Sequence, residues 1–484
     1  MRHHATHFGI DLALALAGGI AMRHAFGLDP VWWLAWLAPA PVLVAALRSG
    51  PWRAFLLTLL AGLVASSASF HYFTLAMPLP VAVLVTVLLA LTWALVVGLA
   101  RRVLLRVASP WAVLAYPLLW CAVDTLMAHL HPDGNWSSLA YSQAQFLPAV
   151  QVLALAGTAG LVFVLSLLPA TIALAVQRGW QAARTPLLLA LVLTVATFAY
   201  GFARIPSTAP PQGDLVGLAV IDDYLGPRVP PSLGQQVWTQ YEAHVAALAG
   251  QGARIVVLPE KIDTLTPAAA QALQARLAAL AARHGVWLAA GIGVDDDGSK
   301  RNLAWLMTPD GHLDANYQKH HIAPPEREFL PGAEYAVRVA ASARYGLAIC
   351  KDLHFAAMGR AYGTRQVQAL LVPAWDFDED GLYAARLSAL RGVESGFAMV
   401  RAARQGLLTV TDPYGRIVAE TPSAGLPGTT LLARVPAQHV ATLYARTGDL
   451  FGWLCTAAAA LLLVLAFGPR GARAVPREAA ATVA

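Results

Sequence analysis

The chain has 484 residues, of which 57% are hydrophobic and only 13% are charged, with a mean hydropathy of +0.55. So apolar a composition excludes an ordinary soluble globular protein and indicates an integral membrane protein. The formal net charge of +6 comes mostly from loops between apolar segments. We therefore attribute it to membrane topology and expect no nucleic-acid partner.

The apolar residues fall into segments long enough to cross a hydrocarbon core of roughly 30 Å. We expect spans at 8–25, 31–47, 53–74, 79–99, 110–128, 148–176, 186–204 and 449–467. The sequence thus predicts a membrane domain over 1–205 with seven transmembrane helices. It also predicts an eighth transmembrane helix within 447–468, for eight in all, followed by a basic tail over 469–484.

The loops between these segments alternate in charge. Arg48, Arg101 and Arg178 belong to basic loops, whereas the intervening loops carry almost no Lys or Arg. Because Lys and Arg are retained on the cytoplasmic side, we expect both ends of the chain and the tail 469–484 in the cytoplasm. Residues 206–446 then form an extracytoplasmic domain.

Residues 206–446 alternate between short β-favouring runs and Ala-rich helical stretches. The strongest expected helices are Gln235–Ala249, Pro267–His284 and Leu382–Ser395. The expected strands are Leu215–Ile221, Arg254–Pro259, Val286–Val294, Leu303–Thr308, Tyr345–Cys350, Ala369–Pro373, Ala398–Ala402 and Leu407–Thr411. This alternation predicts a layered α/β domain, in which chemistry belongs at the ends of strands.

Three strand ends carry chemically distinctive residues. Glu260 follows an apolar strand, Lys319 lies on a connection after a strand pair, and Cys350 ends a third strand. The other cysteines, Cys121 and Cys455, sit in apolar segments and cannot reach Cys350 to form a disulfide. A thiol, a carboxylate and an ammonium supply the nucleophile, base and oxyanion cation that acyl transfer through a thioester needs.

The order Leu258-Pro259-Glu260, then Lys319 with Pro324 five residues later, then Ala348-Ile349-Cys350 resembles the nitrilase superfamily of carbon–nitrogen hydrolases. The resemblance implies an αββα sandwich with a Glu-Lys-Cys triad. A nitrilase-like domain between seven spans and an eighth is similar to the bacterial apolipoprotein N-acyltransferase family. Further matches are Trp136, Tyr141–Gln143, Pro373–Trp375, Arg386, Arg391, Glu394 and Arg401–Ile417.

The resemblance implies a role for each triad residue. Glu260 would be the general base, and Lys319 would stabilise the thiolate and the tetrahedral oxyanion. Cys350 would take an acyl chain from a phospholipid donor and pass it to the N-terminal amine of a diacylated lipoprotein acceptor. No metal or organic cofactor is required. The implied location is the bacterial inner membrane, with the catalytic domain on the periplasmic side.

The resemblance also points to supporting residues. A second carboxylate is expected after the lysine, where we prefer Glu328 and keep Glu326 as the alternative. Trp375 follows the strand after the cysteine. Trp238 corresponds roughly to a tryptophan near the pocket, although packing in the core also explains it. His320, His321 and His354 flank the site without the spacing of a zinc motif, so we expect no metal site.

The chain departs from the family pattern directly after the nucleophile. Where the family has Tyr-Glu, this chain has Lys351 and Asp352. We expect Asp352 to preserve the negative charge and Lys351 to favour the thiolate as a second nearby ammonium. Because this change affects both the donor and the acceptor, two alternatives stay open: a membrane-anchored amidase, or a diverged paralogue that acylates another amine. The sequence does not define the oligomeric state.

Overall fold

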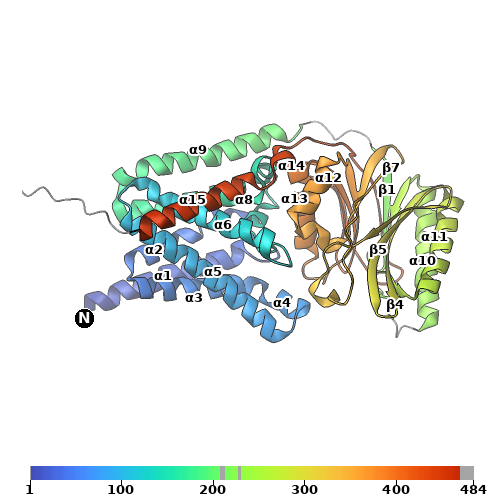
Figure 1. Ribbon diagram of the computed structural model, residues 1–484, viewed down its shortest axis with the longest axis horizontal. Coiled ribbons are helices and arrows are strands. Elements are labelled where there is room, and N and C mark those ends of the chain that lie inside the picture. Colours follow the sequence, from blue (N-terminus) through green and yellow to red (C-terminus); the bar gives the residue numbers. More distant parts are fainter. Residues whose placement is uncertain (1, 208–212, 227–229, 469–484) are drawn as a thin grey trace, which may run out of the picture.

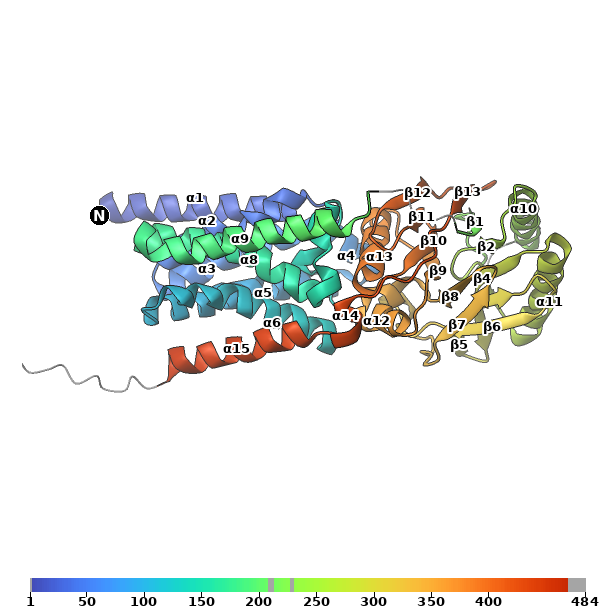
Figure 2. The same cartoon turned by 90° about the horizontal axis from the view of Figure 1, so that it is seen from above.

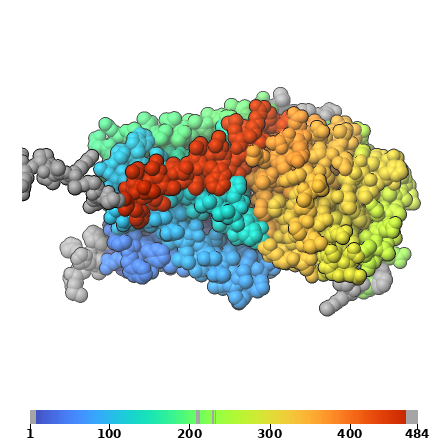
Figure 3. All heavy atoms as spheres, viewed as in Figure 1, coloured from blue at the N-terminus to red at the C-terminus, as the bar shows by residue number. Residues whose placement is uncertain are grey.

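The computed structural model describes residues 2–207, 213–226 and 230–468, so the predicted tail over 469–484 lies outside the described residues. A bundle of helices occupies one end of an elongated molecule, and a sandwich of two sheets occupies the other (Figure 1). In the space-filling view, the two parts meet along a continuous contact and α15 (Leu450–Phe467) lies along the outside of the bundle (Figure 3).

Seven helical segments in the described residues are long and apolar enough to cross a membrane. They are α1 (Phe8–Ala25 of Arg2–Ala25), α3 with α4 (Pro51–Ser66 and Phe70–Ala76), α5 (Leu79–Arg106), α6 with its preceding 3-10 turn (Pro110–Leu130), α8 (Leu153–Arg178), α9 (Trp180–Arg204) and α15. The expected span at 31–47 is shorter. It is a 3-10 turn, Trp32–Trp36, followed by α2 (Pro39–Arg48), which begins at a proline that cannot continue a preceding helix. The count of eight is therefore not confirmed.

The C-terminal ends of α5 and α15 lie at the end of the bundle away from the sandwich (Figure 2). Arg101 of α5 donates from Nε to the carbonyl of Ala46 in α2 at 2.8 Å. Arg106 of α5 donates to the carbonyl of Ala466 in α15 at 2.9 Å. Because basic side chains satisfy the free carbonyls at helix C-termini, this end is both basic and well capped. An eight-pass topology with this end in the cytoplasm remains our prediction.

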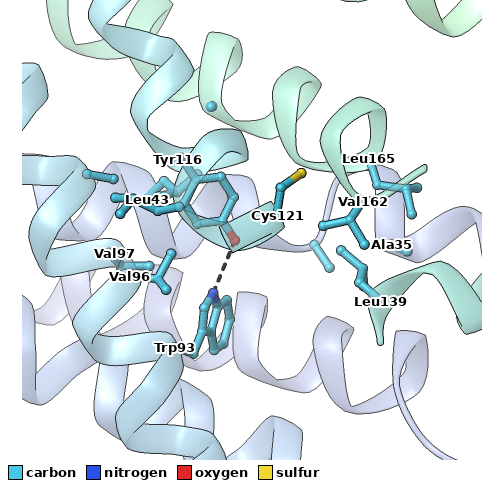
Figure 4. Packing of buried hydrophobic residues seen from close by; sticks show 14 of the residues in the cluster. Ala35, Leu43, Trp93, Val96, Val97, Tyr116, Cys121, Leu139, Val162 and Leu165 are labelled. Atoms are coloured by element: carbon cyan, nitrogen blue, oxygen red, sulfur yellow. Dashed lines mark hydrogen bonds between the residues drawn. The ribbon is translucent and has the colours of Figure 1, made fainter. Parts of the chain in front are cut away.

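The interior of the bundle is mostly apolar, although it also buries polar groups such as Asp124 of α6, whose carboxylate accepts from Asn135 Nδ2 at 2.7 Å. Trp93 of α5 and Tyr116 of α6 point toward each other among Leu43, Val97 and Val162, and the Trp93 indole N–H donates to the Tyr116 hydroxyl at 3.1 Å (Figure 4). A buried indole N–H requires such a partner because no water is available to it.

The second part of the molecule is an αββα sandwich, as expected from the sequence. The seven-stranded sheet has the order β13 (Thr429–Arg434), β1 (Leu215–Val220), β2 (Ile255–Val257), β4 (Trp287–Asp296), β5 (Ser299–Met307) and β6 (Leu313–Gln318), with β3 (Thr264–Leu265) beside β4. The six-stranded sheet has the order β12 (Ile417–Pro422), β11 (Leu407–Thr411), β10 (Ala398–Arg404), β9 (Ala369–Trp375), β8 (Ala343–Leu347) and β7 (Ala336–Ala340).

Helices cover both outer faces of the sandwich. α10 (Pro231–Gly250) and α11 (Pro267–His284) pack on the seven-stranded sheet, and α12 (Ala356–Thr364) and α13 (Gly381–Ser395) pack on the other. The far side of α13 faces the bundle, because its Leu387, Leu390 and Val393 join the bundle's hydrophobic core. Short helices α7 (Leu147–Val150) and α14 (Leu443–Thr447) complete the junction.

Candidate active site

Cys350 lies at a sharp turn between β8 and the 3-10 helix Cys350–His354. Its φ of +41° is left-handed, a conformation that strains a residue with a Cβ and that persists only where the surroundings hold it. The Sγ donates to the carbonyl of Trp375, at the end of β9, over 3.4 Å. The turn thus presents the thiol at the C-terminal ends of two parallel strands, β8 and β9.

Lys319 directly follows β6 and is buried between two carboxylates. Its Nζ is 2.7 Å from Glu260 Oε1 and 2.7 Å from Glu326 Oε2. Burial alone would lower the pKa of Lys319, but the charges of Glu260 and Glu326 outweigh it and hold the pKa well above its ordinary value. Lys319 therefore carries a fixed positive charge.

Glu260 follows β2 and lies at the same edge of the sandwich as Cys350. Its carboxylate accepts from Asn302 Nδ2 at 2.6 Å as well as from Lys319. Its backbone N–H donates at 3.3 Å to the carbonyl of Ala374. The next residue, Trp375, accepts the hydrogen bond from the Cys350 thiol, so both contacts lie at the end of β9. Burial first, and then the charge of Glu260, raise the pKa of the Cys350 thiol against the opposing effect of Lys319. The resting nucleophile is therefore a neutral thiol, which needs a base.

The structure brings Glu326, rather than Glu328, to this cluster. Glu326 ends the 3-10 turn Pro324–Glu326 and contacts both Lys319 and Lys261. Burial raises the pKa of Glu326, but the charges of Lys319 and Lys261 outweigh it and lower the pKa to about 2. Glu328 instead pairs with Lys300 at 2.8 Å on the surface, with 60% of its side chain exposed. The sequence preference for Glu328 is therefore wrong, because the turn directs only the earlier carboxylate inward.

The ammonium of Lys351, which is expected from the sequence to favour the thiolate, is paired with a carboxylate of the membrane domain. Its Nζ donates to the Asp133 carboxylate, in the loop after α6, and to the carbonyl of Ile322 at 2.8 Å. Burial lowers the pKa of Lys351, and Asp133 opposes that effect. The charge that was expected to favour the thiolate is thus paired with the membrane domain.

Asp352 is fully buried and accepts hydrogen bonds from both sheets of the sandwich. The Tyr317 hydroxyl donates to it at 2.7 Å, the backbone N–H of His321 at 2.9 Å and the backbone N–H of Ile349 at 2.9 Å. Burial would raise the pKa of Asp352, but the hydrogen bonds from His321 and Tyr317 lower it. Its permanent negative charge therefore ties the segment after Lys319 to the turn that carries Cys350.

The two tryptophans selected from the sequence lie in different places. The Trp375 ring lies 3.6 Å from the Arg404 guanidinium and 4.9 Å from Lys261 Nζ, next to the site. Trp238 is buried with Tyr241 in the layer between α10 and the seven-stranded sheet. Its position supports packing in the core rather than a role in the site.

Three further residues, Asn302, Lys261 and Asp133, belong to the site or touch it, and the sequence did not identify them. Asn302 is a buried amide at the start of an apolar strand run, and Lys261 is the neighbour of Glu260. Both positions offered a signal, namely a polar residue next to buried β-structure. Asp133 is 218 positions from its partner Lys351 and offered none. Among the described residues, no group of three His, Cys, Asp or Glu side chains is arranged to hold a metal ion.

Comparison with known proteins gives matches for both parts of the molecule. The family model of the carbon–nitrogen hydrolases matches residues 228–443, so the sandwich is a carbon–nitrogen hydrolase domain. The model of the apolipoprotein N-acyltransferase N-terminal domain matches residues 18–171. An apolipoprotein N-acyltransferase of Geobacter metallireducens is 29% identical, over 94% of this chain and 95% of its own length. The two family models together match most of the chain, and the relatives that match nearly its whole length are apolipoprotein N-acyltransferases, so the chain is similar to that family in both of its parts.

The sandwich alone also has relatives. An omega-amidase of Xenopus laevis is 26% identical over 40% of this chain and 81% of its own length. An amidase of the nitrilase superfamily from Nesterenkonia AN1 has a solved structure that aligns with a TM-score of 0.42 and 22% identity, covering 50% of this chain and 98% of that one.

Proposed function

We propose that this membrane protein moves an acyl chain from a phospholipid, through a thioester on Cys350, to the N-terminal amine of a diacylated lipoprotein. The observation that carries this proposal is the buried Lys319–Glu260 pair beside a thiol, in a domain mounted on helices of membrane-spanning length. The relatives that match nearly the whole chain are apolipoprotein N-acyltransferases, which supports the same proposal.

In the first half-reaction, Glu260 takes the thiol proton as Cys350 Sγ attacks the ester carbonyl of the phospholipid. Lys319 and the backbone N–H of Lys351 stabilise the oxyanion of the tetrahedral intermediate. The ester C–O bond then breaks. The lysophospholipid alcohol leaves with the proton returned by Glu260, and the acyl chain stays on sulfur.

In the second half-reaction, the lipoprotein amine attacks the thioester carbonyl and Glu260 takes a proton from the attacking nitrogen. The C–S bond breaks, the amide leaves, and the Cys350 thiolate regains a proton from Glu260. Glu326, with a pKa of about 2, stays anionic throughout. It therefore keeps Lys319 charged and in place while Glu260 gains and loses its proton.

Attachment of the sandwich to membrane-spanning helices fits substrates that are both anchored in lipid. A thiol held at the surface of the bilayer meets them by lateral diffusion, which replaces part of the entropy cost of an encounter in solution. We further propose that the basic end of the bundle lies in the cytoplasm. The sandwich is then on the periplasmic side of the inner membrane.

Acyl labelling of the full-length protein tests this function. Incubated in vesicles with phospholipid that carries a labelled acyl chain, the wild type should acquire a label that hydroxylamine releases. Cys350→Ala should acquire none, whereas Cys121→Ala, which changes a buried thiol of the bundle, should be labelled like the wild type. Equal labelling of Cys350→Ala, or no label from any phospholipid, would contradict the proposal.

A second candidate follows from the omega-amidase relatives and from the exchange of an aromatic residue for Lys351. In this alternative, the same triad hydrolyses a small amide or acylates a different amine. Cleavage of small amides that depends on Cys350, with no acyl label from phospholipid, would favour the amidase. If phospholipid labels Cys350, but the label is removed by a different amine and not by a lipoprotein amine, the protein would be an acyltransferase for that different amine.

A further inference from the structure

A loop of the membrane domain reaches the residues on either side of the active site. In this loop, which follows α6 (Ala115–Leu130), both carboxylate oxygens of Asp133 accept from Arg327 Nη2, at 2.8 and 2.9 Å. Asp133 Oδ1 also accepts from Lys351 Nζ. Lys351 is the neighbour of Cys350, and Arg327 is the neighbour of Glu326. We call Asp133, Lys351 and Arg327 the Asp133 clamp.

The clamp is partly buried and closely packed. Only 5% of the Lys351 side chain is exposed, and its one other hydrogen bond goes to the Ile322 carbonyl. A buried ammonium is costly unless a counter-charge accompanies it. Beside Asp133, Gly134 has a φ of +72°, and a Cβ there would approach the His354 carbonyl to 3.3 Å. The loop therefore lies directly on the 3-10 helix that begins at Cys350.

We propose that Asp133 is a positioning residue that anchors the turn carrying the nucleophile to the membrane domain. This inference rests on the proposed function. Cys350 has a strained, left-handed backbone, so neighbouring contacts must hold it there. Asp352 supplies the contact from the sandwich, and Asp133, acting through Lys351, supplies the contact from the bundle.

The clamp also accounts for the departure of this chain from the Tyr-Glu pattern after the cysteine. A lysine at position 351 is stable in a buried place because a carboxylate of the membrane domain faces it. The second arm, through Arg327, is half exposed and so contributes less. The loop that bears Asp133 directly follows α6, which is long and apolar enough to cross a membrane, so the clamp joins the turn that carries the thiol to the part of the chain expected to meet the lipid.

A double-mutant cycle tests the clamp. The rate of Cys350 acylation is measured for the wild type, Asp133→Asn, Lys351→Met and the double variant, at increasing fractions of labelled phospholipid in vesicles. Each single variant should lose about tenfold in rate at saturating donor, because the thiol is displaced from its attacking position. The donor fraction that gives half the maximal rate should not change. The double variant should be no slower than the slower single variant, because both remove the same contact.

Two further variants distinguish a displaced Cys350 thiol from a general loss of stability in the fold. Asp133→Glu, which keeps the charge, should regain most of the lost rate. Glu242→Gln removes a carboxylate from the exposed pair with Arg276 on the outer helices, and should match the wild type. The double variant also leaves no unpaired buried ammonium, so it remains informative if Asp133→Asn alone does not fold.

Losses that multiply in the double variant, or a wild-type rate in Asp133→Asn, would overturn the clamp. A wild type that forms no acyl adduct would instead refute the proposed function. The clamp is then still tested by alkylation of Cys350 with iodoacetamide. That rate should change in Asp133→Asn and stay at the wild-type value in Glu242→Gln, and equal rates in both would reject the clamp.

Discussion

The bundle and the sandwich differ in where they place most of their charged side chains. The sandwich buries Lys319, Glu260, Glu326 and Lys261 together at one edge. The bundle has arginines at its basic end, where Arg101, for example, donates to a helix-terminal carbonyl. Burying charge costs far more than leaving it at a surface, and this cluster is where we propose that the chemistry takes place. The bundle provides a mount whose stability comes from apolar packing.

The largest expected effect is the loss of the buried ammonium. Lys319→Met removes the ammonium between Glu260 and Glu326, and with it the charge that we propose stabilises the oxyanion, so acylation of Cys350 should fall by about 10³-fold or more. Acyl labelling measures this fall. Lys300→Met, which removes a lysine from a surface pair in the same domain, is the matched control and should retain activity. A fall in both variants would remove the distinction between buried and surface charge.

The next effect separates two glutamates only two residues apart. Glu326→Gln removes an anion that holds Lys319, so the labelling rate should fall by about 10²-fold. Glu328→Gln should leave the rate unchanged, because its carboxylate faces solvent. The reverse ranking would reinstate the choice made from the sequence.

The pH dependence of thiol reactivity gives a third test. Because burial and Glu260 raise the pKa of Cys350, alkylation by iodoacetamide should be slow at neutral pH and accelerate as the pH rises into the alkaline range. Glu260→Gln removes a negative charge that opposes the thiolate, so its profile should move to lower pH even though acyl transfer falls. A shift of the profile to higher pH would show that Glu260 does not face the thiol.

The smallest effect belongs to the bundle. Trp93→Phe removes the hydrogen bond to Tyr116, so the free energy of unfolding should fall by about 1 kcal/mol. Thermal unfolding in detergent measures this change. Acyl labelling of the folded variant should equal that of the wild type, and a large loss would mean that the bundle does more than support the sandwich.

The fold was predictable because each part has a strong sequence signal. Long apolar segments mark the bundle, and runs such as Arg254–Pro259 mark the buried strands. The outer strand β6 was missed because polar side chains alternate with Ala315 and Tyr317, so no continuous apolar run marks it. The segment at 31–47 was apolar enough to suggest a span, but Pro39 divides it.

The candidate site was only partly predictable. The spacing of Glu260, Lys319 and Cys350 along the chain identified the residues that the structure brings to one edge, and their chemical roles remain proposals. The choice between Glu326 and Glu328 depended on which residue a single 3-10 turn directs inward, and sequence spacing does not define that direction. The partner of Lys351 comes from a distant loop of the other domain, so no local pattern indicated it.

One carboxylate has a mechanical consequence for the whole sandwich. Asp352 accepts from Tyr317 of β6, in one sheet, and from Ile349, which extends β8 in the other. The Asp352 carboxylate thus joins the two sheets by hydrogen bonds at the edge that holds the candidate site. The same carboxylate accepts from the backbone N–H of His321, two residues after Lys319, so a single side chain links the segment after the ammonium to the backbone just before the thiol.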